Sequence, residues 1–160
     1  MTLSLDLDTL LAGITTTARA ITGIRTALDY DEWPDSPPGL FNKDQALHLT
    51  GFPEEGDGFR YIPRGTDLSE YEFTVPLYTV VIEAAKVKRS RGWAAPYLDR
   101  YRTAFDTRTN ILAVGTGNTG SVLYMGATVV RAIPDWDGYA NFYMLRHRLT
   151  AHVKGAVSRD

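Results

Sequence analysis

The residues Gly115–Gly120 read Gly-Thr-Gly-Asn-Thr-Gly, which matches the G-x-G-x-x-G pattern of dinucleotide-binding proteins. In those proteins a helix begins directly after the glycines, and its N-terminus binds the pyrophosphate. Here the glycines are followed by SVLYMGATVV (residues 121–130), which is typical of a β-strand. We therefore interpret the motif as a hairpin turn, because glycine adopts a positive φ without steric cost, and we expect no nucleotide cofactor.

The three histidines are the candidate metal ligands. His147 and His152 are five residues apart on one predicted strand, so their side chains point to opposite faces of the sheet. They cannot share a metal ion in that arrangement, and His48 stands alone in the segment ALHLT. We therefore expect no metal site.

Catalysis by a nucleophile or by paired carboxyl groups has little support in the sequence. The chain has no cysteine, and none of its serines lies in a G-x-S-x-G segment. Paired acids occur at Glu54 and Glu55 and at Asp135 and Asp137, but both pairs lie in turn-like segments, whereas a general acid requires burial. We expect no catalytic residues and a protein that is not an enzyme.

Charge is distributed unevenly along the chain. The net charge is −2 at pH 7, so no overall basic field favours nucleic acid. Residues 29–72 carry eleven acids and three bases, whereas residues 86–108 carry seven bases and two acids. The two segments are either solvated faces of opposite sign or the two sides of a head-to-tail contact. No apolar run approaches the roughly 20 residues that span a bilayer, and acids occupy the N-terminus where a secretory signal carries bases, so we expect an intracellular protein.

Hydrophobic periodicity predicts the elements that hold these residues. Apolar residues at steps of three and four predict helices over Leu5–Leu28 and Trp93–Phe105, with a basic turn at residues 86–92 before the second. Five strands are predicted, at Ala46–Gly51, Glu70–Ala84, Ile111–Val114, Val122–Ile133 and Tyr139–Val153. The apolar phase of the second strand changes beside Pro76, which predicts a bulge or bend there. The order predicts one α+β domain over residues 1–160: a mainly antiparallel sheet with a long N-terminal helix and a second helix packed on one face.

Residues 52–69 are predicted to form a long loop or arm. A connection of this length inside a compact domain is usually functional or disordered. Its aromatic residues, among them Phe59 and Tyr61, are too apolar for a solvated tether. We expect an arm that packs on another molecule, with folding back onto its own domain as the alternative.

Basic residues supply two further candidate protein interfaces. Arg89 and Arg91 lie in the predicted basic turn. Arg146, Arg148 and Lys154 alternate along the last strand, so they project from the face opposite to its apolar residues. This face lacks the interleaved aromatic residues of a single-strand nucleic-acid platform. We expect it to contact an acidic protein surface; the alternatives are a plain exposed sheet face and a nucleic-acid site.

Taken in order, these elements resemble the tail-terminator, or tail-completion, proteins of long-tailed bacteriophages. The likeness covers most of the chain and begins with the N-terminal amphipathic helix and the proline-rich passage PDSPPGLF. It continues through the long loop, the strand YEFTVPLYTVVIEA, the helix GWAAPYLDRYRTAF and the glycine-rich turn. It ends with the closing strands VLYMGATVVRAIPDW and NFYMLRHRLTAHV.

The resemblance implies a structural subunit of a hexameric ring at the head-proximal end of the tail tube. Such a ring ends tube polymerisation and joins the tail to the head connector. The implied partners are other copies of the chain, the tail tube protein and the head–tail connector protein, with no membrane involved. The resemblance also implies that DNA passes through the lumen without specific binding, and that the virion is assembled in the host bacterial cytoplasm. The alternatives are another neck protein of the same particle and, from a different class, a small α+β enzyme with a pocket near Trp93, Tyr97 or Asp137.

Overall fold

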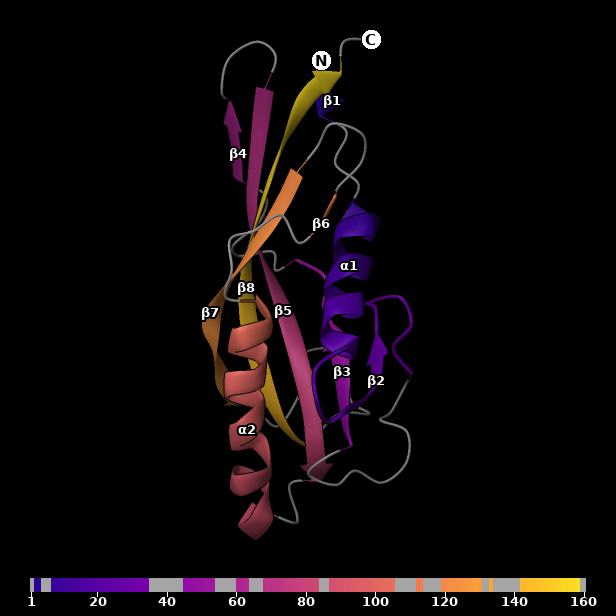
Figure 1. Ribbon diagram of the computed structural model, residues 1–160, viewed down its shortest axis with the longest axis vertical. Helices are drawn as coiled ribbons and strands as arrows, with labels where there is room; N and C mark the ends of the chain where they lie inside the picture. Colours follow the sequence, from indigo (N-terminus) through magenta and orange to yellow (C-terminus); the bar gives the residue numbers. More distant parts are fainter. Residues whose placement is uncertain are drawn as a thin grey trace.

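Two helices cover one face of a mixed β-sheet in the computed structural model (Figure 1). The structure describes residues 2–3, 7–34, 45–53, 60–63, 68–83, 87–105, 112–113, 119–130, 133 and 142–158. In chain order its elements are β1 (Thr2–Leu3), α1 (Leu7–Arg19), β2 (Ile24–Leu28), β3 (Ala46–Thr50), β4 (Arg60–Pro63), β5 (Leu68–Glu83), α2 (Val87–Phe105), β6 (Leu112–Ala113), β7 (Thr119–Val130) and β8 (Phe142–Ser158).

The sheet has the strand order β2-β3-β5-β8-β7-β6, with β4 paired to β5 and β1 paired to β8. Strand β2 runs parallel to β3, while β5 is antiparallel to both β3 and β8, and β8 is antiparallel to β7. The α+β class is therefore confirmed, with a mixed sheet. Strands β5 and β8 contain 16 and 17 residues and form a long ribbon. One end of that ribbon extends beyond both helices and carries β4 and β1 (Figure 1).

The N-terminal helix is shorter than predicted. It spans 13 residues and ends at Arg19, so the prediction of a helix through Leu28 is wrong. Gly23 has a φ of 92°, and a Cβ there would lie 2.5 Å from the Tyr97 hydroxyl, so the chain turns at a position that suits only glycine. The following residues form strand β2. The apolar spacing continued past the helix because Ile21 also packs into the same core.

The second helix is longer than predicted. It begins at Val87, so the basic segment read as a turn forms its first turns. Pro96 therefore lies inside the helix, although its lack of an N–H group removes one intrahelical hydrogen bond. The buried stripe consists of Ala94, Tyr97, Tyr101 and Phe105. Leu98, which lies on the same helix beside Tyr97, is 40 % exposed.

Strand β5 is buried on both faces of the sheet. Val75 and Leu77 belong to the main core under the helices, whereas Tyr78 and Val80 belong to a second cluster. Because successive residues of a strand face opposite ways, the two clusters lie on opposite sides of the sheet. The second cluster is completed by Leu47, Leu49, Ile133 and Met144.

This second cluster explains the change of apolar phase beside Pro76. Pro76 pairs with Arg148 without interruption, and the register shift of this ribbon lies between Val80 and Ile82. The bulge predicted at Pro76 is therefore wrong in position. The phase changes because the apolar residues change from one core to the other.

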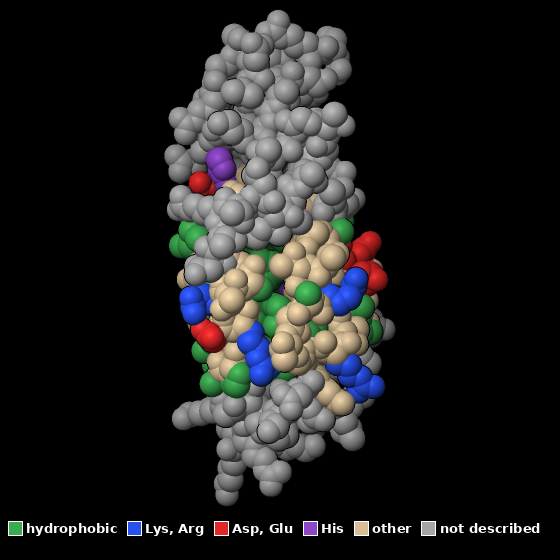
Figure 2. Space-filling view, viewed as in Figure 1, with side chains coloured by type: hydrophobic (Ala, Val, Ile, Leu, Met, Phe, Trp, Pro, Cys, Tyr) green, Lys and Arg blue, Asp and Glu red, His purple; other side chains and the backbone are tan. Residues whose placement is uncertain are grey.

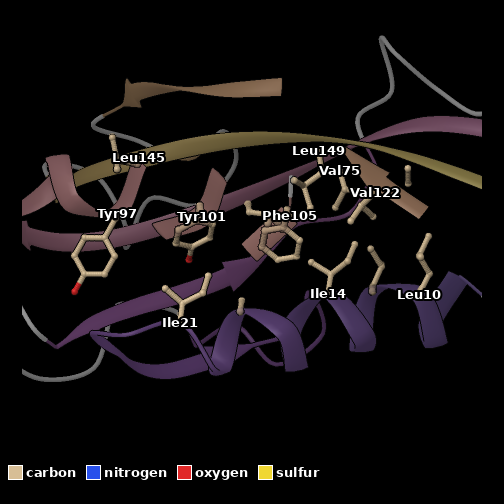
Figure 3. Packing of buried hydrophobic residues seen from close by; sticks show 14 of the residues in the cluster. Leu10, Ile14, Ile21, Val75, Tyr97, Tyr101, Phe105, Val122, Leu145 and Leu149 are labelled. Carbon is tan, nitrogen blue, oxygen red and sulfur yellow. The ribbon is translucent and has the colours of Figure 1, made fainter. Parts of the chain in front are cut away.

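The main core lies between the two helices and the sheet (Figure 3). Helix α1 contributes Leu10 and Ile14, and helix α2 contributes Tyr101 and Phe105, all without exposed surface. They point toward sheet residues that include Val75, Val122, Leu145 and Leu149 (Figure 3). Burial of one such side chain stabilises the fold by about 1.5–3 kcal/mol. This packing fixes α2 against β5, β7 and β8.

The predicted loop over residues 52–69 contains a strand. Residues Arg60–Pro63 form β4, which pairs antiparallel with the start of β5 through Arg60↔Glu72 and Pro63↔Ser69. The long-loop prediction is therefore wrong for these residues, which extend the β5–β8 ribbon with a third strand. The short strand length and the proline at its end had hidden this segment from the periodicity analysis.

A buried histidine network and candidate assembly surfaces

The glycine-rich motif leads into a strand, as predicted. Strands β6 and β7 pair antiparallel through Leu112↔Gly120 and Ala113↔Thr119, so the chain reverses between them. Residues 114–118 lie outside the described part of the chain. Strand β7 then continues to Val130, so the helix N-terminus that binds a pyrophosphate in nucleotide-binding proteins does not follow these glycines.

His48 lies in a buried chain of hydrogen bonds that ends on helix α1. The Thr15 hydroxyl donates to the carbonyl oxygen of Leu11 at 3.0 Å, so it must accept from Thr50 at 2.7 Å. Thr50 then accepts from Nε2 of His48 at 2.8 Å, which leaves Nδ1 of His48 to accept from the Tyr101 hydroxyl. Each hydroxyl has one proton, so these contacts assign the Nε2–H tautomer to His48.

His147 continues the same chain on the other side of Tyr101. Its ring stacks on the Tyr101 ring, with centroids 3.8 Å apart. Thr79 hydrogen-bonds Tyr101 and lies 2.7 Å from Nε2 of His147, while the Tyr124 hydroxyl lies 2.8 Å from Nδ1. Since Tyr101 already donates to His48, Thr79 donates to Tyr101 and accepts from His147, which accepts from Tyr124. One directed chain thus links β7, β8, β5, α2, β3 and α1.

Burial holds both histidines in the neutral form. It lowers the pKa of His48 to about 3, with a smaller contribution from the positive charge of Arg19. Burial also lowers the pKa of His147 well below its ordinary value, with a smaller effect of His48. Both rings are fully enclosed, with their nitrogens occupied by hydroxyl partners. They bind the core elements to one another and face no open space for a substrate.

Sequence reasoning missed this network. His48 was read as isolated, and His147 was compared only with His152. The available signal was that His147 shares the apolar phase of its strand with Leu145 and Leu149, which indicates a buried histidine that requires polar partners. The members of the network lie on six elements, and no spacing in the sequence identifies them.

The arginine stripe of β8 lies on the outer face of the sheet, away from the helices. Arg146 is half-buried and Arg148 is exposed, while Leu145 and His147 are buried on the other face, so the predicted alternation is confirmed. Burial lowers the pKa of Arg146, and the charge of Arg148 lowers it further. Lys154 follows in the same phase, opposite Glu70 of β5. The stripe thus holds two neighbouring positive charges on one face.

A hollow of about 220 Å³ lies beside this stripe, lined by residues that include Glu72, Ser121 and His152. These three stand abreast on β5, β8 and β7, because His152 pairs with Glu72 on one side and with Ser121 on the other. Serine, histidine and a carboxylate are the residue types of a hydrolase triad. The backbone N–H groups of the described strands lie in the plane of the sheet, so they supply no oxyanion hole above this row. The three residues form a polar row on the outer face.

The other predicted site residues are not gathered in one place. Phe59 lies outside the described residues, and Tyr61 is on β4 opposite Tyr71. Arg89 and Arg91 are in the first turns of α2, which lie at the other end of the molecule's long axis from β4 (Figure 1). They therefore cannot form a single surface with the arm.

Tyr97, one of the residues predicted near an enzyme pocket, lies in the main core. This side chain is fully buried, and its hydroxyl donates to the carbonyl oxygen of Gly23 at 3.0 Å. Arg100 lies over the Tyr97 ring and donates to the carbonyl oxygen of Thr22 at 2.9 Å. The contacts of Tyr97 and Arg100 therefore fix the turn after α1. Asp137 and the side chain of Trp93 lie outside the described part of the structure.

Large apolar side chains are exposed on helix α2 and at the margins of the sheet. Figure 2 shows hydrophobic groups on both sides of the described band, between charged and polar groups. The exposed large apolar residues among those described are Phe52, Leu98, Met125 and Val129, with exposed fractions of 50 %, 40 %, 60 % and 51 %. The described residues contain no cluster of three histidine, aspartate or glutamate side chains that could hold a metal ion. In the described helices no segment is both long and apolar enough to cross a membrane.

No protein-family model and no curated protein matches the sequence. Among solved structures, one similar chain belongs to a structure titled "Virion of native gene transfer agent (GTA) particle". The two chains are 16 % identical with a TM-score of 0.48, over 93 % of this chain and 96 % of the other. This likeness is weak, so the function proposed below is based on the surfaces of this chain.

Proposed function

We propose that this protein is a structural virion subunit that forms a ring at the head-proximal end of a phage tail tube. In this proposal the ring ends tube polymerisation and joins the tail to the head connector, without any bond chemistry. Its partners are other copies of the chain, the tail tube protein and the connector protein, and DNA passes through its hole. The hexameric state and the tail-terminator role come from the sequence resemblance.

One observation carries the proposal: in the described residues the histidine network is fully buried, whereas large apolar side chains are exposed. His48 and His147 are enclosed in a satisfied network, whereas Phe52 and Met125 are half-exposed or more at the sheet margins. An exposed large apolar side chain beside charged groups is typical of a protein contact. Recognition through surfaces is therefore the activity that these residues favour.

The arginine stripe has a defined place in this proposal. A lumen lined by Arg146 and Arg148 would bind DNA through counterion release and hinder its passage. We therefore assign the stripe to a contact with an acidic protein surface. Its two guanidinium groups suit the carboxylates of a neighbouring subunit or of the tube.

Native mass spectrometry and electron microscopy of the purified chain, alone and with tubes of the tail tube protein from the same genome, test this function. We expect a ring-shaped hexamer that caps tube ends and limits tube length. A protein that forms no oligomer at any concentration and binds no tube ends would contradict the proposal. Binding to the connector without binding to tube ends would favour the alternative of another neck protein.

A further inference from the structure

Two of the exposed large apolar residues, Phe52 and Met125, lie at opposite margins of the sheet and at the same height along the strands. On β5, Pro76 pairs with Arg148 of β8. On the other side of β8, the bulge of β7 between Tyr124 and Ala127 lies opposite Arg148, so Met125 lies next to Arg148. On the other side of β5, Gly51 donates its N–H to the Pro76 carbonyl oxygen at 2.8 Å, and Phe52 follows it. A single row across the sheet therefore runs from Phe52 to Met125.

Around Met125, strand β7 forms an edge of the described sheet, and the basic residue Arg148 lies beside it. In the described residues β6 pairs with β7 only at Thr119 and Gly120, so β7 is the edge strand from Ser121 onward. Gly126 has a φ of 113° and shapes the bulge, which interrupts regular pairing and so disfavours addition of another strand. A partner is therefore expected to bind Met125 through side chains, beside the exposed Arg148.

The margin around Phe52 is aromatic and acidic. The ring of Phe52 packs edge-to-face on Tyr30, with centroids 5.2 Å apart. Asp31 and Glu32 are exposed directly after Tyr30, and the Glu32 carboxylate accepts the N–H of Asp29 at 3.1 Å. The two margins are therefore complementary in charge. Acidic groups lie beside the aromatic residues of this margin, whereas a basic group lies beside the apolar Met125 of the other.

We propose that the Met125 margin of one copy docks on the Phe52 margin of the next copy, with Arg148 facing Asp31 and Glu32. This inference rests on the proposed ring and names the surfaces that build it. The contact is heterologous, so each copy uses one margin for each neighbour. Because both margins lie on one level of the sheet, successive copies are related by rotation about an axis along the strands with little translation. Such a relation closes a ring when the rotation divides the circle evenly, whereas a translation along the axis would build a helical filament.

The absence of cysteine from the chain makes a clean cross-linking test possible. We would prepare Met125→Cys and Phe52→Cys separately and treat each, and their mixture, with a short bismaleimide linker. The expected result is a cross-linked dimer in the mixture only, and a ladder up to the closed ring for the chain that carries both substitutions. Thr16→Cys is the matched control, because Thr16 is also exposed but lies on α1. Mixed with Phe52→Cys it should give no dimer.

The outcomes separate this inference from the proposed function. If Met125→Cys cross-links to itself, the contact is two-fold symmetric and the inference is overturned. If the unmodified chain forms rings in native mass spectra but the mixture gives no cross-link, the inference is overturned while the proposed function stands. If the unmodified chain forms neither oligomers nor complexes with tube ends, the proposed function itself fails.

Discussion

The helix-covered face of the sheet and its two margins follow different rules. Under the helices, polar groups such as His48, Thr50 and Thr79 are buried and hydrogen-bonded. At the margins, Phe52 and Met125 are large apolar groups left in contact with solvent. Burial of polar groups and exposure of apolar groups both cost free energy, so both must be compensated elsewhere. The first is explained by a network that fixes the core, and the second by a partner that covers the margins.

The largest expected change in the free energy of unfolding comes from the loss of an aromatic side chain in the core. Phe105→Ala removes a fully buried ring of α2 and should lower the free energy of unfolding by about 3–5 kcal/mol. Leu98→Ala on the same helix changes a 40 % exposed side chain and should cost less than about 1 kcal/mol. Urea unfolding followed by circular dichroism measures both. Equal losses would contradict the assignment of the buried face of α2.

The next largest effect tests the hydrogen-bond chain. Tyr101→Phe removes a hydroxyl that donates to His48 and accepts from Thr79, so it should lower the free energy of unfolding by about 1–3 kcal/mol. Tyr124→Phe removes the partly exposed end of the chain and should cost less, since water can replace its hydroxyl. The same urea titrations compare the two. A larger loss for Tyr124→Phe would show that the chain is not centred on Tyr101.

The two histidines should also make stability depend on pH. Burial lowers the pKa of His48 to about 3, whereas an unfolded histidine titrates near 6.5. Below about pH 6.5 the unfolded chain binds protons that the folded chain excludes, so the free energy of unfolding should fall by up to about 1.4 kcal/mol per pH unit per histidine. This loss should continue toward pH 3 for His48.

Unfolding titrations between pH 7 and pH 4 measure this dependence. Carboxyl groups also titrate at the acidic end of that range, so the double variant His48→Gln/His147→Gln is the reference. Its stability should change less with pH than that of the unmodified chain. The same slope in both proteins would mean that the histidines are not held neutral by the fold.

The smallest expected effect on stability concerns the outer face. Arg148→Glu reverses an exposed charge and should change the free energy of unfolding by less than about 0.5 kcal/mol. If this face contacts an acidic surface, the same variant should lose oligomers in native mass spectra. A variant that combines Arg148→Glu with Asp31→Arg should regain part of them. If the Arg148→Glu variant forms the same oligomers as the unmodified chain, Arg148 does not lie in the contact between subunits.

The strands were more predictable than the helix ends. The alternation along β8 indicated its two faces correctly, because one face is buried and the strand period is two residues. The helix prediction ran past Arg19 because Ile21 continues the apolar spacing, and the turn at Gly23 depends on close contact with Tyr97 of a distant element. Local patterns carry no information about such a contact.

The candidate site was less predictable than the fold. The stripe of Arg146 and Arg148 follows from one strand and was found in the sequence. The row from Phe52 to Met125 depends on the pairing of β3, β5, β8 and β7, which only the tertiary structure defines. Met125 was read as a strand residue, because a bulge at Gly126 leaves no signal that distinguishes it from an ordinary glycine in a strand.

The central claim is that the exposed margins of the sheet, and not its buried polar groups, carry the function. Native mass spectrometry of Met125→Asp, paired with its urea unfolding curve, tests this claim most directly. We predict the loss of the hexamer, with an unfolding midpoint equal to that of the unmodified chain when both are diluted to the monomer. The exposed control Thr16→Asp keeps the hexamer. A Met125→Asp protein that still assembles as the unmodified chain does would contradict the account.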